Sequence, residues 1–154
     1  MDDRLGWLLD ARLIATLATM EPDGSAYLSA VWFLRDGDEL LVATGGQTRK
    51  AMNAAARPRA SVLVDTHGPG ALRGAAATGT VTVIRGEEAL ALNDRVWAKY
   101  LTAAGRAHPQ AGVAIGEHDD VTIRFRPDAW RTWGTDEDFG GALEEPGVAY
   151  PLDS

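Results

Sequence analysis

The sequence predicts a mainly β domain in which about six antiparallel strands form a closed or half-closed barrel, accompanied by two or three helices. Three observations support this fold class. Short apolar runs with strand-like alternation recur along the 154 residues. Asp-Gly turns join the first of these runs, so these strands must pair antiparallel, because a parallel pair needs a crossover of a dozen or more residues. Few stretches have helical periodicity, and a barrel leaves no exposed sheet edges.

The first part of the chain predicts one helix and three strands. Residues 2–11 form an amphipathic segment in which Leu5, Leu8 and Leu9 recur at helical spacing. The predicted strands cover residues 13–19, 26–34 and 39–44. The turns EPDGS and DGDE separate them, since proline presets φ and Asp-Gly accepts the positive φ of a tight reversal. These three strands are therefore expected to be antiparallel neighbours.

The remaining elements follow from helix and strand signals. They are, in order, a helix over 48–56, strands over 60–66 and 75–86, a helix over 87–104 and a strand over 120–134. Arg57-Pro58-Arg59 ends the first of these helices. Trp7 and Trp97 are expected in the core, as apolar residues of amphipathic helices. Three further tryptophans fit a core, a dimer interface or the wall of a planar ligand, namely Trp32, Trp130 and Trp133.

The charge distribution argues against nucleic acid as a partner. The net charge is −7, but residues 136–154 hold six acidic residues and no lysine or arginine. The preceding body has 16 acidic and 15 basic residues, a net charge of −1. Binding to nucleic acid needs a clustered basic face, which this composition does not suggest. We expect a single domain over 1–135, followed by an acidic tail over 136–154.

Several kinds of site are not supported by the sequence. There is no cysteine, which removes disulfides, thiolate zinc sites and cysteine nucleophiles. No Gly-x-Ser-x-Gly elbow or P-loop spacing occurs, and the contiguous Glu117, His118, Asp119 and Asp120 fit a polar loop better than a metal site. No stretch approaches the roughly 20 apolar residues of a membrane span, and no leader pattern opens the chain. We therefore predict no catalytic side chain, no metal, no membrane partner and a cytoplasmic location.

The segment GGQTRK, residues 45–50, carries the clearest functional signal. Arg49 and Lys50 fall in the first turn of a predicted helix, where cations oppose the helix dipole unless an anion faces them. Gly45 and Gly46 allow a ligand to approach the backbone closely, and Thr48 can cap the helix or donate its hydroxyl. Together these features suit a phosphate. The alternative is a solvated pair of cations after a strand.

The order of the motifs carries a resemblance to a known family. Over residues 12–65 the chain reads LIATLAT, EPDGSAY, LSAVWFL and ELLVAT, followed by GGQTRKAMN and RPRASVLV. This order resembles the opening of the pyridoxamine 5′-phosphate oxidase-like, flavin-binding split-barrel superfamily. The resemblance implies a six-stranded split barrel and a homodimer, with FMN or alternatively the deazaflavin coenzyme F420 at the dimer interface. The chain lacks the C-terminal Arg-Leu-His-Asp-Arg run of true pyridoxamine phosphate oxidases, so vitamin synthesis is not expected.

The resemblance also implies which residues bind the cofactor. Its phosphate would be held by Thr48, Arg49 and Lys50. Its ring system would be lined by Ser29, Ala30, Val31 and Trp32 and approached past Ala43, Thr44 and Gly45. Trp130 and Arg131, in the last strand, would reach the partner's cofactor.

Three functions are consistent with these expectations. The first is a flavin- or deazaflavin-dependent oxidoreductase that transfers a hydride between the cofactor ring and a small conjugated substrate. The second is a non-catalytic flavin or haem carrier. A barrel without a cofactor, acting through an interaction surface, would leave the placement of Arg49 and Lys50 unexplained.

Overall fold

The fold is mainly β, as the sequence predicts. The computed structural model describes residues 3–66, 73–110 and 119–134. In these ranges the helices are α1 (Asp3–Asp10), α2 (Arg49–Ala56), α3 (Gly86–Tyr100) and α4 (Ala103–Ala107). The strands are β1 (Ala15–Met20), β2 (Ala26–Val31), β3 (Leu34–Asp36), β4 (Glu39–Gly45), β5 (Arg59–Asp65), β6 (Gly74–Ile84) and β7 (Asp120–Trp133). The predicted acidic tail, 136–154, lies outside the described residues.

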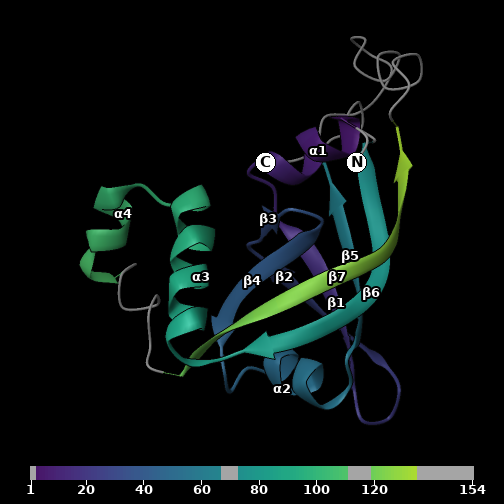
Figure 1. The fold of residues 1–154 in the computed structure, drawn as a ribbon, viewed down its shortest axis with the longest axis horizontal. Helices are drawn as coiled ribbons and strands as arrows, with labels where there is room; N and C mark the ends of the chain where they lie inside the picture. Colours follow the sequence, from purple (N-terminus) through teal and green to yellow (C-terminus); the bar gives the residue numbers. More distant parts are fainter. Residues whose placement is uncertain (1–2, 67–72, 111–118, 135–154) are drawn as a thin grey trace.

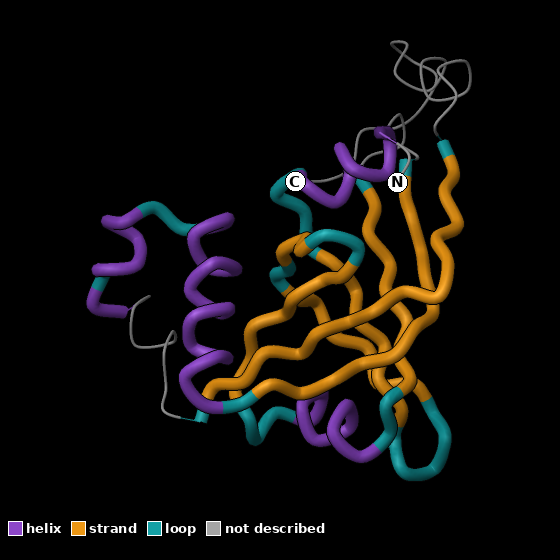
Figure 2. Tube along the Cα trace, viewed as in Figure 1, coloured by secondary structure: helices purple, strands orange, loops and turns teal. Residues whose placement is uncertain are grey.

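All seven of these strands belong to one antiparallel sheet, in the order β2-β1-β5-β6-β7-β4-β3. The two strands at its ends, β2 and β3, follow one another in the chain and are linked by Trp32 and Phe33. The sheet therefore rolls into a barrel (Figure 2). Closure by consecutive strands explains why so long an antiparallel sheet does not present two distant open edges.

The predicted strand over 26–34 is in fact two strands, so the count is seven instead of six. Its first part pairs with β1, where Val31 faces Ala15, and its last part pairs with β4, where Leu34 faces Leu41. The chain thus leaves one neighbour for another at Trp32. The strands predicted over 13–19, 26–34 and 39–44 pair antiparallel, as predicted, because β1 pairs with β2 and β3 pairs with β4. However, β4 neighbours β3 and not β2.

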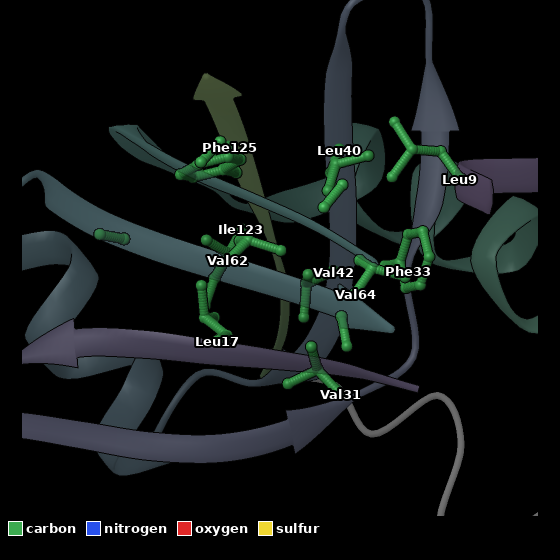
Figure 3. Close-up of a cluster of buried hydrophobic side chains, with 14 of the residues drawn as sticks. Leu9, Leu17, Val31, Phe33, Leu40, Val42, Val62, Val64, Ile123 and Phe125 are labelled. Atoms are coloured by element: carbon green, nitrogen blue, oxygen red, sulfur yellow. The ribbon is translucent and has the colours of Figure 1, made fainter. Parts of the chain in front are cut away.

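The core fills the inside of the barrel and is drawn from nearly every strand. Figure 3 shows side chains of β1, β2, β4, β5 and β7 converging with Phe33 and with Leu9 of α1. Alternation along each strand sends every second side chain inward, as in β7, where the buried apolar residues are Val121, Ile123 and Phe125. Thr122 is buried on the other face, where its hydroxyl donates to the Ala89 carbonyl of α3. Full burial of such a side chain contributes roughly 1.5–3 kcal/mol to folding.

Two helices cover opposite ends of the barrel, α1 at one end and α2 at the other (Figure 1). The predicted apolar face of α1 is confirmed, because Leu5, Leu8 and Leu9 are buried. The prediction that Trp7 is a core residue is wrong, since its side chain is 55% exposed. Trp7 is two residues from both Leu5 and Leu9, or about 200° around the helix, and so points away from them. Trp97 of α3 is buried, as predicted.

The helix predicted over 87–104 ends at Tyr100, because the chain becomes extended at Leu101. Thr102 then caps the short α4, accepting a hydrogen bond from the backbone N–H of Gly105.

The predicted EPDGS turn is confirmed, with Gly24 at a φ of 86° and Glu21 donating its backbone N–H to the Ser25 carbonyl at 2.8 Å. None of the helices in the described ranges is long and apolar enough to cross a membrane.

Candidate functional site

The N-terminus of α2 has no side-chain cap, although Thr48 occupies the capping position. The Thr48 hydroxyl instead donates to the Gly45 carbonyl at 2.8 Å and lies 3.1 Å from the Thr44 hydroxyl. The first-turn N–H groups of a helix have no acceptor within the helix. Because Thr48 does not supply one, these groups, with the positive end of the helix dipole, remain suited to an external anion.

Lys50 is the half-buried cation of this helix terminus. Burial lowers the pKa of its ammonium by desolvation. In the ranges that the structure describes, Lys50 makes no hydrogen bond or ion pair. A cation taken partly out of water without an acceptor is unfavourable. An anion in front of α2 would remove that penalty.

Arg49 has an internal anion, which the sequence analysis did not identify. Its Nε lies 2.7 Å from Oε1 of Glu21, whose side chain is only 10% exposed. Its guanidinium carbon also lies 5.5 Å from the centre of the Tyr27 ring, a cation–π contact. Glu21 belongs to a turn 28 positions earlier, and nothing in the local sequence marks it as a partner. The two cations are therefore not equivalent, since Arg49 is paired with Glu21 and Lys50 has no partner among the described residues.

The helix that carries Lys50 is anchored to the end of β1. Arg57 donates from Nε to the Met20 carbonyl at 2.7 Å and from Nη2 to Oδ1 of Asn53 at 2.9 Å. The buried Asn53 amide reaches the Thr19 hydroxyl at 3.4 Å. The sequence predicts only that Arg57-Pro58-Arg59 ends the helix, which it does at Ala56. The structure gives Arg57 a second role, holding α2 against the barrel.

The two glycines before α2 differ in their surroundings. A Cβ at Gly46 would lie 2.5 Å from the Asp119 carbonyl oxygen, and the Gly46 N–H donates to that oxygen at 2.9 Å. Gly46 therefore allows close packing against the backbone that enters β7, and its space is not left for a ligand. At Gly45 the nearest contact of a Cβ would be an ordinary one, 3.6 Å from Cγ2 of Thr48.

The predicted ring-lining residues lie along an edge of the sheet. Within the described residues β2 pairs only with β1, so its other edge keeps unpaired backbone groups. Ser29 donates weakly to the Leu17 carbonyl at 3.4 Å, Ala30 is exposed, and the Val31 side chain is buried in the core. The side chain of Val31 thus faces the barrel interior, and only its backbone groups are available to a ligand.

Trp32 and Phe33, which follow β2, lie just before the paired part of β3 and β4. The β3–β4 register pairs Leu34 with Leu41. Continued by two residues, it would place Trp32 opposite Ala43, but the described pairing stops at Leu34. The pairing of β3 with β4 therefore ends at Leu41, three residues before Thr44. That Ser29 to Trp32 and Ala43 to Lys50 line one site stays a prediction of the resemblance.

Trp130 and Arg131 do not join this group within one chain. The β6–β7 register shifts between Thr78 and Gly79, which reverses the facing of the β7 side chains beyond it. Trp130 consequently packs against the core, with its indole Nε1 buried and without a hydrogen bond to any described residue. Arg131 is exposed and lines an outer groove of about 690 Å³. This end of β7 lies far from α2 (Figure 1), so a shared site would require a second copy of the chain.

The described residues hold no cluster of three or more side chains that could bind a metal ion. Glu117 and His118 of the acidic loop lie outside those residues.

Trp32 has an intramolecular partner, because its ring stacks on the Tyr100 ring with centroids 4.9 Å apart and planes 7° apart. One face of the Trp32 indole is therefore covered by Tyr100 of α3.

Comparisons with known proteins place this geometry in a family. Residues 1–134 match the family model described as pyridoxamine 5′-phosphate oxidase. A conserved hypothetical protein of Mycobacterium tuberculosis, Rv2991, is 25% identical, with a TM-score of 0.73, over 92% of this chain and 88% of that one. A solved F420 reductase is 26% identical, with a TM-score of 0.64, over 81% and 94%.

The haem storage protein HutZ of Vibrio cholerae shares the fold, with a TM-score of 0.68 over 84% of this chain and 92% of that one, but only 14% identity. No curated protein matches the sequence significantly. The family model spans nearly all of the chain outside the acidic tail. The chain therefore belongs to the pyridoxamine 5′-phosphate oxidase family, and its barrel is the split barrel of that family.

Proposed function

We propose that this protein is an oxidoreductase that binds FMN or the deazaflavin coenzyme F420, with the cofactor phosphate at the N-terminus of α2. The observation that carries the proposal is Lys50. It is half-buried, it has no partner among the described residues, and it follows a helix start that Thr48 leaves uncapped. A phosphate would supply the acceptor oxygens that both the ammonium and the first-turn N–H groups need.

The residues around Lys50 fit a phosphate on a ribityl arm. Lys50 would donate to a phosphate oxygen, and the hydroxyls of Thr44 and Thr48, which already lie 3.1 Å apart, would border the arm. The free edge of β2 from Ser29 to Trp32 would offer backbone N–H and C=O groups to the polar edge of the ring. Arg49 would contribute through its charge, reduced by its ion pair with Glu21.

The bound cofactor would supply hydride transfer to or from a small conjugated substrate. The backbone groups of Ser29 to Trp32 and the ring of Trp32 would orient the ring of the cofactor. Membership in the family supports FMN, and the 26% identity to a solved F420 reductase supports the deazaflavin. Both cofactors make the same demand on Lys50, since each carries a phosphate.

We further propose a homodimer with the cofactor at the interface. The outer face of β1, β5, β6 and β7 forms the groove of about 690 Å³, lined mainly by small side chains. Leu28 and Leu63 border it and are 63% and 36% exposed. A second copy would cover these apolar side chains and bring an Arg131 toward the other copy's cofactor. Stable interfaces of this kind commonly bury more than about 2,000 Å² in total.

The second candidate is a carrier of flavin or haem without turnover. The likeness to the haem storage protein HutZ concerns the fold alone, at 14% identity.

The test that distinguishes the oxidoreductase from the carrier is the absorption spectrum of the purified protein after separate incubation with FMN, F420 and haem and removal of unbound ligand. Retention of FMN or F420, anaerobic reduction and reoxidation by an added acceptor would support the oxidoreductase. Retention of haem alone would contradict it.

A further inference from the structure

We propose that Tyr100, at the C-terminal end of α3, is a positioning residue for the proposed cofactor site. It holds Trp32 and the crossing from β2 to β3 in the geometry that the ring of the cofactor requires. This inference rests on the proposed function, because it assigns a role to a residue that supports the cofactor-binding edge without touching the cofactor.

The Tyr100 hydroxyl contacts three backbone groups from two other parts of the chain. It accepts a hydrogen bond from the Phe33 N–H at 3.2 Å, and it lies 2.8 Å from the Leu13 carbonyl oxygen and 3.0 Å from that of Phe33. A hydroxyl has one proton to donate and two lone pairs to accept. One hydroxyl therefore ties the residues before β1 to the crossing between β2 and β3.

Phe33 needs these partners because of its place in the sheet. It lies between β2 and β3 and belongs to neither ladder, yet its residue surface is completely buried. Buried backbone groups outside a ladder must find another partner. Tyr100 accepts from the Phe33 N–H, and its single proton is available to the carbonyl of Phe33 or of Leu13. Burial raises the pKa of Tyr100, so the hydroxyl keeps the proton that it donates.

Trp32 is held by the same tyrosine through its ring. The two rings are stacked, with a centroid distance of 4.9 Å and an angle of 7°. Tyr100 thus fixes the side chain of Trp32 by stacking and the backbone immediately after it by hydrogen bonds. Trp32 directly follows β2, and only its face away from Tyr100 can form a wall for a planar ring. A rigid wall of this kind lowers the cost of ordering the site when a ligand binds.

The test compares the full-length wild type with Tyr100→Phe, which keeps the stacked ring and removes only the hydroxyl. The matched control is Thr122→Val. The Thr122 hydroxyl also bonds α3, through the Ala89 carbonyl at 3.1 Å and Oδ1 of Asn93 at 2.7 Å, but it lies on the β7 side of the helix. Both variants lose one hydroxyl that forms hydrogen bonds at a contact of α3, so general destabilisation is expected in both. FMN and F420 are titrated into each protein, and the visible spectrum of the bound cofactor is recorded.

We expect Tyr100→Phe to weaken binding of the cofactor about tenfold, the value of one net hydrogen bond, and to shift its visible absorption band. Thr122→Val should leave both unchanged. A third variant, Trp32→Phe, keeps the hydrogen bonds of Tyr100 and should shift the same band, which provides a test even if Tyr100→Phe is too unstable to study.

Unchanged affinity and spectrum in Tyr100→Phe would overturn the positioning role while leaving the proposed function intact. An unchanged spectrum in Trp32→Phe, or an equal effect of Thr122→Val, would overturn it as well. If the wild type binds neither cofactor, the proposed function fails first, and the role of Tyr100 in it fails with it.

Discussion

Replacing Lys50 by methionine should change ligand affinity and protein stability in opposite directions. The methionine keeps an apolar stem of similar length and removes the ammonium. In the free protein this cation is half-buried and has no partner among the described residues, so its removal relieves a desolvation penalty. In the complex it would bond a phosphate, so its removal eliminates a charged hydrogen bond.

The magnitudes follow from these two environments. A hydrogen bond to a charged group contributes about 1.5–3 kcal/mol, which is roughly one to two decades of affinity. The free energy of unfolding of the ligand-free protein should change by at most about 0.5 kcal/mol, toward greater stability, because Lys50 is partly solvated. The folded-state pKa of Lys50 is lowered by burial. Its penalty is therefore present below that pKa and disappears as the pH rises toward the unfolded value of 10.5.

The assay is a titration of FMN and F420 into wild type and Lys50→Met, together with urea unfolding of each ligand-free protein. Arg106→Met is the control for loss of one positive charge, since Arg106 lies on α4 and pairs with Asp94. Cofactor affinity should fall in Lys50→Met only. Affinity within about threefold of wild type, or a clear loss of stability without ligand, would refute the assignment of Lys50 to a phosphate.

Three other outcomes are expected. Glu21→Gln frees Arg49 from its ion pair, so FMN titrations at low salt should show affinity raised roughly threefold to tenfold, and an unchanged or weaker affinity would argue against a phosphate near Arg49. Burial lowers the pKa of Lys99 to about 8 from 10.5, so the folded state should gain stability as the pH rises between these two values. Urea unfolding of wild type at pH 7.5 and 10 should show this gain. The same gain in Lys99→Met would exclude this lysine as its source. Leu28→Asp places a charge on the exposed apolar rim of the outer groove, so light scattering should show a dimer for wild type and a monomer for the variant, whereas a folded wild-type monomer at low micromolar concentration would contradict the dimer.

The sequence predicted the parts of the fold that depend on neighbouring residues. Tight turns such as the one at Gly24 are encoded locally by Asp-Gly, and the apolar face of α1 follows from its spacing. The split of the strand over 26–34 was missed because it results from pairing with β1 on one side and β4 on the other. Nothing in the local alternation marks that exchange. Trp7 was misplaced because its size suggested burial although its angular position on α1 opposes Leu5 and Leu9.

The candidate site shows the same division. Arg49 and Lys50 stand out in the sequence because cations are unusual at the start of a helix. Their inequivalence does not, since it depends on Glu21 reaching Arg49 from another turn. The supporting contacts are also long-range, and Tyr100 bonds Phe33 from 67 positions away. The sequence predicts that Gly46 allows a close backbone approach, but it does not show that the neighbouring backbone is that of Asp119.

The most direct test of the phosphate site compares a cofactor with the same ring system lacking the phosphate. FMN and riboflavin form one such pair, and F420 and its phosphate-free deazaflavin form the other. The pair whose cofactor binds wild type more tightly is titrated into wild type and Lys50→Met. We expect the phosphate to improve wild-type affinity by roughly one to two decades and most of that advantage to be absent in Lys50→Met. Equal affinity of wild type for the forms with and without the phosphate would contradict a phosphate site at the N-terminus of α2.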